Sequence, residues 1–184
     1  MVAEVEIAVR ILEPRWKLDV PAAVATARRA ASAALAASMP AKLRQAARRR
    51  TIELNLVLAD DRTVRRLNRE FRNVDKPTNV LSFGDPAQWR VRGPATPIVL
   101  GDVILARETV TAEAVAQGKP MKDHARHLIV HGVLHLLGHD HLRRSAARKM
   151  EAIEIGVLAQ LGVANPYWIA GGKALPGRAG HHRT

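Results

Sequence analysis

The sequence contains no cysteine and no long apolar run. Without cysteine the chain forms no disulfide and offers no thiolate, so a transition metal would have to be held by histidine or carboxylate side chains. No uninterrupted apolar stretch approaches the roughly 20 residues of a membrane-spanning helix. Residues 1–5 are acidic and alternating, unlike the basic and then apolar start of a signal peptide, and we therefore expect a cytoplasmic protein.

Acidic residues are scarce relative to basic ones. The chain has 17 Asp and Glu against 29 Lys and Arg, which gives a net charge of +12. An excess of this size attracts polyanions, and nucleic acid is the commonest of them. The same excess fits a solubilising surface in an arginine-rich proteome. The basic run at 42–50 is open in the same way, because it fits a solvated helix face as well as an RNA contact.

The order of apolar patterns indicates an α/β protein. Alternating apolar residues predict strands, and apolar residues spaced by three and four predict helices. The strands are expected at 5–11, 52–58, 79–83 and 98–105, and the helices at 22–38, 60–72, 107–117, 120–137 and 143–161. We predict one domain over residues 1–168, with a small, mostly four-stranded sheet packed with about five helices. Residues 169–184 are rich in glycine and proline and basic, and they predict a disordered tail.

Two positions in these elements predict local packing. In the helix at 60–72, Val64, Leu67 and Phe71 recur at three- and four-residue spacing and predict an apolar face. Gly101 lies inside the strand at 98–105, where a glycine indicates a bulge or a close approach of another backbone.

Three histidines, His131, His135 and His141, stand in the pattern H-x3-H-x5-H. His131 and His135 are four residues apart, so a helix places them on one face, one turn apart. Gly138 accepts the left-handed conformation that ends a helix, and the turn after it can return His141 to the other two. Three imidazoles with a fourth position for water describe a catalytic zinc site. The sequence therefore predicts one Zn²⁺ per chain on a zincin-like helix, although Ni²⁺ and Cu²⁺ also bind three imidazoles.

The spacing is that of the zincin signature H-E-x-x-H-x-x-G-x-x-H, with one departure. Gly132 stands where the metalloproteases carry the glutamate that activates the zinc-bound water. The metal ligands of a protease are therefore present, while its general base is missing.

The neighbours of the three histidines have open roles. His127 lies one turn before His131 and either supports a ligand or is exposed. His139 follows Gly138 and is predicted in a loop. Asp140 is either a fourth ligand or, as we prefer, the group that orients a ligand imidazole.

Two long segments resemble the signatures of the bacterial YbeY family. Residues 67–83 read L-N-R-E-F-R-N-V-D-K-P-T-N-V-L-S-F, and residues 131–141 read H-G-V-L-H-L-L-G-H-D-H. The dipeptides Gly101-Asp102 and Met150-Glu151 fit the same pattern. The resemblance covers roughly residues 51–161. It does not explain the alanine-rich helix with its basic run, or the residues after 168.

The resemblance implies a metal-dependent, single-strand-specific endoribonuclease. The family acts in ribosomal RNA maturation, at the small-subunit 3′ end, and in ribosome quality control. The implied partners are single-stranded RNA and the ribosome, with no DNA and no membrane. The resemblance also implies Zn²⁺ bound by His131, His135 and His141, and a functional arginine at Arg72. A guanidinium suits that role because it grips a phosphate with two parallel hydrogen bonds. Lys76 is a further candidate for backbone binding.

The sequence does not identify the general base. Asp85, Asp102, a ribose hydroxyl and a metal-bound hydroxide are all candidates, so the sequence does not separate hydrolysis from attack by the 2′-hydroxyl.

Two other functions fit parts of the sequence. One is a non-catalytic RNA-binding factor of ribosome assembly with a structural zinc, which a fourth protein ligand such as Asp140 would favour because structural sites are closed. The other is a zinc peptidase, which Gly132 opposes.

Overall fold

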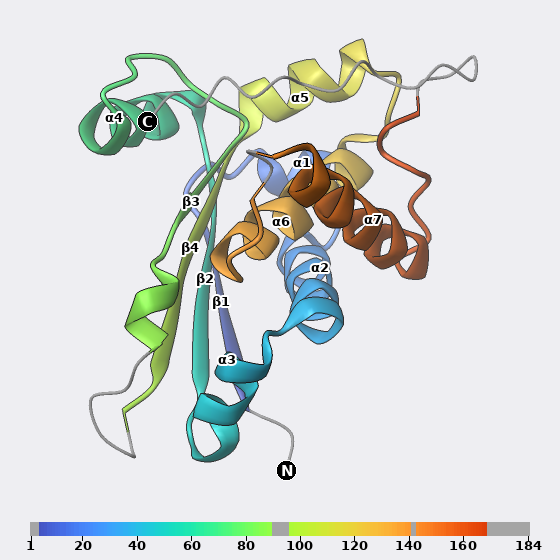
Figure 1. The fold of residues 1–184 in the computed structure, drawn as a ribbon. Coiled ribbons are helices and arrows are strands. Elements are labelled where there is room, and N and C mark those ends of the chain that lie inside the picture. Colours follow the sequence, from blue (N-terminus) through green and yellow to red (C-terminus); the bar gives the residue numbers. More distant parts are fainter. Residues whose placement is uncertain (1–3, 90–95, 141–142, 169–184) are drawn as a thin grey trace.

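The computed structural model describes residues 4–89, 96–140 and 143–168 and contains one sheet (Figure 1). Its strands are β1 (Val5–Ile11), β2 (Ile52–Ala59), β3 (Val80–Phe83) and β4 (Ile98–Ala106), in the order β1-β2-β4-β3. The strands β1, β2 and β4 run parallel, and β3 pairs antiparallel with β4 at the edge. The predicted α/β class and the four strands are confirmed.

Over the described residues, the helices include the five that the sequence predicts and two more. The seven are α1 (Trp16–Asp19), α2 (Ala23–Ser38), α3 (Ala41–Ala46), α4 (Asp61–Arg72), α5 (Arg107–Ala116), α6 (Met121–Leu136) and α7 (Arg144–Gln160). The count of about five missed α1 and α3, because four and six residues are too few for an apolar period to show. The basic run lies in α3 and a short 3-10 turn, Ala47–Arg49. The predicted tail at 169–184 lies outside the described residues.

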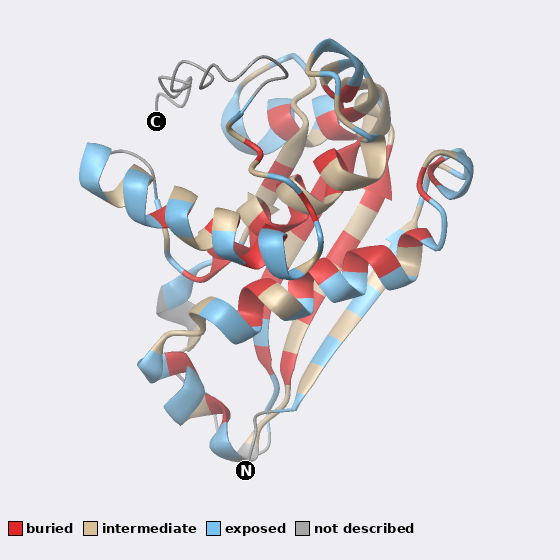
Figure 2. Ribbon diagram, turned by 90° about the vertical axis from the view of Figure 1, so that its right-hand side faces the viewer, coloured by how far each residue is buried: buried red, intermediate tan, exposed pale blue. Residues whose placement is uncertain are grey.

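The sheet separates two apolar layers. Helices α2, α6 and α7 lie on one side of it in Figure 1, and α4 lies on the other. The larger core joins α2, α6 and α7 to the sheet, and Figure 2 shows its buried residues along α2 and α6. The smaller core lies under α4 and contains Ala59, Val64, Leu81, Ile104 and Ala106. In the described part of the chain, no helix has the length and apolarity to cross a membrane.

The edge strand β3 contacts both layers, because successive side chains of a strand point to opposite faces. Leu81 packs in the smaller core. The hydroxyl of Ser82 donates to the carbonyl oxygen of Gly132 in α6, at 3.2 Å. The short strand β3 therefore stands between α4 and α6.

The close approach expected at Gly101 is present. Its φ of 134° suits glycine, and a Cβ there would lie 2.2 Å from the carbonyl oxygen of Phe83. The pairing of β2 with β4 shifts its register at the same place, between Glu53 and Leu54. The bulge thus lets β3 close against β4 where β3 ends.

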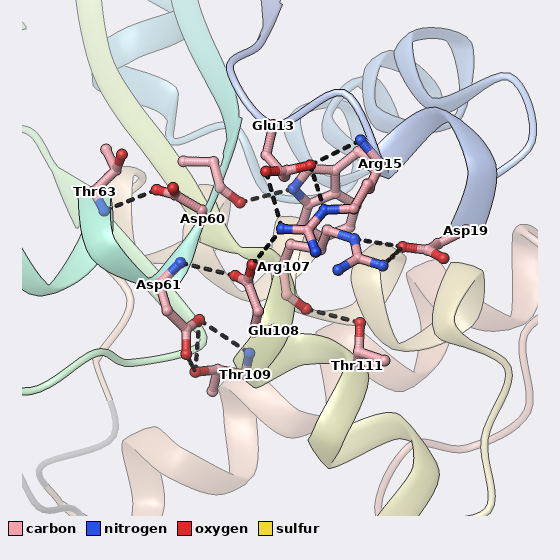
Figure 3. A network of polar contacts seen from close by, with 12 residues as sticks. Glu13, Arg15, Asp19, Asp60, Asp61, Thr63, Arg107, Glu108, Thr109 and Thr111 are labelled. Carbon is pink, nitrogen blue, oxygen red and sulfur yellow. Dashed lines mark hydrogen bonds and ion pairs between the residues drawn. The ribbon is translucent and has the colours of Figure 1, made fainter.

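A polar network fixes the start of α4 (Figure 3). Asp60 caps the helix by accepting a hydrogen bond from the backbone N–H of Thr63, at 2.8 Å. Asp61 accepts from the backbone N–H of Thr109 in α5, and Glu108 in turn accepts from the backbone N–H of Asp61. Because the first turn of α4 is tied to α5 in both directions, the position of Arg72 at its last turn is defined.

Candidate functional site

The site begins with two imidazoles on one face of α6. The Nε2 atoms of His131 and His135 lie 3.0 Å apart. The helix ends at Leu136, and Gly138 has a φ of 88°, so the predicted glycine termination is confirmed. His139 follows in a loop, as expected.

The Nδ1 atoms of both imidazoles are bound to acceptors. His131 Nδ1 donates to the Glu154 carboxylate at 2.8 Å, and His135 Nδ1 donates to the carbonyl oxygen of His139 at 3.0 Å. A carbonyl oxygen and an ionised carboxylate only accept, so each ring carries its proton on Nδ1. In the neutral rings both Nε2 atoms then present lone pairs to each other.

This arrangement fits a metal ion. Two facing lone pairs at 3.0 Å repel each other unless a proton or a metal ion lies between them. Two nitrogens bound to one tetrahedral zinc at about 2.0–2.1 Å would be about 3.3 Å apart, close to the observed separation. Histidine ligands of metals also hold their second ring nitrogen on a carboxylate or a backbone carbonyl, as both do here. The donor set therefore fits Zn²⁺ or a similar transition metal.

The third expected ligand, His141, lies outside the described residues. Within the described ranges, no group of three or more His, Cys, Asp or Glu residues is arranged to hold a metal ion. The structure thus brings together two of the three predicted ligands, and the role of His141 stays a prediction.

Glu154, on α7, is the residue of this site that the sequence analysis missed. It is fully buried and accepts hydrogen bonds from His131 Nδ1, from His127 Nε2 at 3.2 Å and from the Tyr167 hydroxyl. Burial alone would raise the pKa of Glu154, but the hydrogen bonds from the two histidines outweigh it and lower the pKa. The carboxylate is therefore ionised and holds the ring of His131 in one tautomer.

A sequence signal for Glu154 existed. Met150, Ile153 and Val157 define the apolar face of α7, and position 154 falls on that same face by its spacing. An acidic side chain on a buried face needs a partner, because an unpaired buried charge is costly. The partner itself could not be read from the sequence.

The structure assigns contacts to His127 and His139, the two histidines next to the predicted ligands. His127 donates to Glu154, and burial lowers the pKa of this imidazole, so it supports the His131 side of the site. The ring of His139 lies 2.6 Å from the hydroxyl of Ser38 at the end of α2, which holds the loop that carries the acceptor for His135. The orienting role expected of Asp140 is taken, for these two imidazoles, by Glu154 and the His139 carbonyl.

Gly132 is required by packing. A Cβ at this position would lie 2.6 Å from Val103 Cγ1 and 2.9 Å from Ser82 Oγ, so position 132 faces the sheet. A glutamate would have no room there. The absence of the peptidase base is thus built into the contact of α6 with β3 and β4, which argues against the zinc peptidase.

Replacing Gly132 by alanine is expected to destabilise the fold by about 1–3 kcal/mol, the usual cost of overpacking a core. Gly156 in α7 is the matched control, because a Cβ there meets nothing within 4 Å. Gly156→Ala should raise the free energy of unfolding by up to about 1 kcal/mol, since alanine favours a helix. Urea unfolding of both variants measures the difference, and a neutral Gly132→Ala variant would contradict the packing argument.

Arg72 lies on the other side of the edge strand. It donates from Nη2 to the carbonyl oxygen of Ser82 at 3.4 Å, and its guanidinium lies 5.9 Å from the ring centroid of Phe83. Burial lowers its pKa, yet an arginine stays charged at neutral pH. Because the Ser82 hydroxyl reaches Gly132, Arg72 and the histidine helix both contact β3 at Ser82, from opposite layers.

The arrangement of β4 excludes one of the candidate bases. Val103 faces α6, so its neighbour Asp102 faces the α4 side, where it accepts a hydrogen bond from Asn55 at 2.9 Å. Asp102 is thereby removed from the list of candidate bases at the histidines. Asp85, a ribose hydroxyl and a metal-bound hydroxide stay candidates.

The carbonyl oxygen of Lys76 accepts a hydrogen bond from the side chain of Asn68, which folds the loop after α4 back on the helix.

Comparison with known proteins agrees with these features. A family profile described as Endoribonuclease YbeY matches residues 21–162. A protein of Paramagnetospirillum magneticum named Endoribonuclease YbeY is 49% identical over 170 residues, which cover 91% of this chain and 98% of that protein. A protein of the same name from Rhodospirillum rubrum is 44% identical over 164 residues, which cover 89% of this chain and 82% of that protein.

A solved structure shares the fold. The solution structure of TM1509 from Thermotoga maritima superposes with a TM-score of 0.51 at 18% identity, covering 85% of this chain and 92% of that one. The profile match extends over more than half of the chain, and the Paramagnetospirillum protein matches this chain over nearly its whole length. This chain therefore belongs to the YbeY family.

Proposed function

We propose that this protein is a zinc-dependent endoribonuclease that cuts single-stranded RNA. The observation that carries the proposal is the pair of facing Nε2 atoms on α6, each ring held in the ligating tautomer by an acceptor on its Nδ1. The relatives' name, Endoribonuclease YbeY, supports the reaction class.

The residues of the site would have different roles in RNA cleavage. His131 and His135 would hold the metal, with His141 as the third ligand. When bound, Zn²⁺ supplies a Lewis acid and lowers the pKa of a coordinated water. Arg72 would bind the phosphate to be cut and stabilise the charge that develops on its oxygens. Glu154 positions the ring of His131 through its Nδ1.

The net charge of +12 supports an RNA substrate. Arginines Arg62, Arg66 and Arg69 are exposed on the helix that ends in Arg72. We place the activity in ribosomal RNA processing in the cytoplasm, at the small-subunit 3′ end and in ribosome quality control, with the ribosome as partner. The resemblance to the family supports this part of the proposal.

The test incubates the purified protein, with its zinc content measured, with a single-stranded RNA that carries a small-subunit ribosomal RNA 3′ end. The parent protein is expected to cut it, and His135→Ala is expected to bind less zinc and not to cut it, at an unchanged circular dichroism spectrum. Equal cleavage by both would reveal a contaminating nuclease. RNA binding without cleavage by a fully metallated parent would identify the non-catalytic assembly factor instead.

A further inference from the structure

The two phenylalanines of this chain, Phe71 and Phe83, lie together beside Arg72. Their ring centroids are 5.3 Å apart at an interplanar angle of 59°. Phe83 ends the edge strand β3 and packs against the smaller core, whereas Phe71, in the last turn of α4, is 61% exposed. A largely exposed aromatic ring that contacts Phe83 thus lies next to the phosphate-binding candidate in the sequence.

The exposure of Phe71 departs from its pattern in the sequence. Val64, seven residues earlier on the same face of α4, is fully buried, and that spacing predicts Phe71 against the sheet as well. The smaller core under α4 is formed by few residues, and it ends with Phe83 at the edge of the sheet. The ring of Phe71 therefore reaches past the core and rests only partly on Phe83.

The positive charge around the Phe71 ring indicates which kind of ligand the ring would bind. Helix α4 carries five arginines (62, 65, 66, 69 and 72) against Asp61 and Glu70. Arg72, the neighbour of Phe71, has its guanidinium over the Phe83 ring. Trp168 is the other large aromatic side chain that is exposed in the described residues, and it lies near the end of the described chain and not on the arginine-bearing helix α4. A flat apolar face inside a cationic surface matches an unpaired nucleobase, whose ring stacks while its phosphate meets the arginines.

We propose that Phe71, supported by Phe83, is a stacking platform for an unpaired base of the RNA, adjacent to the phosphate held by Arg72. The platform gives a physical reason for single-strand preference, because the bases of a duplex are stacked inside the helix and cannot reach Phe71. This proposal rests on the proposed function, since it concerns the binding of the same substrate.

The experiment measures binding of a fluorescently labelled 2′-O-methyl RNA 12-mer by anisotropy, with the zinc-loaded full chain and a duplex of the same sequence beside it. Gel analysis after each titration shows that the oligonucleotide is intact. Phe71→Ala is expected to weaken single-strand binding about 5- to 100-fold and to leave duplex binding unchanged. Phe71→Tyr should bind like the parent, whereas Phe71→Leu should lose most of the affinity although it stays apolar.

Leu18→Ala is the matched control for loss of an exposed apolar side chain, and it should not change binding. Equal affinity of Phe71→Ala and the parent, or an equal loss for single strand and duplex, would overturn the platform. If the parent cuts single-stranded RNA while Phe71→Ala binds and cuts normally, the platform fails and the nuclease stands. If the parent binds no RNA, both proposals fall.

Discussion

Replacing Arg72 by alanine is expected to lower kcat/KM for single-stranded RNA by about 10²–10³, with metal binding unchanged. Removal of one preorganised charge donor from a transition state typically costs this much in rate. The structure supports the role because the guanidinium contacts Ser82 and Phe83, and these contacts direct the exposed side chain to the edge strand. Cleavage rates at several RNA concentrations, with the zinc content measured, give the value.

Two further variants separate position from charge. Arg66→Ala removes an equal charge from the exposed surface of the same helix, and it should lower kcat/KM only a few-fold. Arg72→Lys keeps the charge but loses the paired N–H groups of the guanidinium, so its rate should lie between those of the parent and Arg72→Ala. Equal rates for Arg66→Ala and Arg72→Ala would show that α4 contributes general attraction and not a specific phosphate contact.

Replacing Glu154 by glutamine is expected to weaken zinc binding about 10- to 100-fold, the usual effect of losing the group that orients a metal ligand. Glutamine has nearly the same shape, but it is neutral and its amide nitrogen cannot accept a hydrogen bond. It would therefore hold the proton of His131 on Nδ1 less firmly and make Nε2 a poorer donor to the metal. Competition with a chromophoric chelator measures the zinc affinity directly, without reference to RNA cleavage.

The matched control for Glu154→Gln is Glu151→Gln, which removes a carboxylate from the same helix one turn earlier. Glu151 is less buried, and no hydrogen bond joins it to the described histidines, so zinc affinity should stay at the parent value. Tyr167→Phe removes one of the three hydrogen bonds to Glu154 and should have a smaller effect. Unchanged zinc affinity in a folded Glu154→Gln variant would contradict the positioning role.

The sequence by itself determined the features that depend on spacing within one long element. The period of α6 places His131 and His135 on one face, and Gly138 ends that helix because it accepts a positive φ. The alternating strands and the longer helices were found in the same way. Arg72 was selected from the arginines of α4 only through its place in a family signature, since spacing does not distinguish it from its neighbours.

The tertiary structure decided what depends on contacts between distant segments. Glu154 reaches His131 across 23 positions because α7 packs on α6, and Gly132 is required because α6 lies directly on Val103 and Ser82. The order of the strands puts β3 at the edge, where Arg72 and the histidine helix both contact Ser82 and Phe71 reaches past the small core. A periodic pattern shows which side of an element is apolar, but only the packing of layers determines which side chains meet across them.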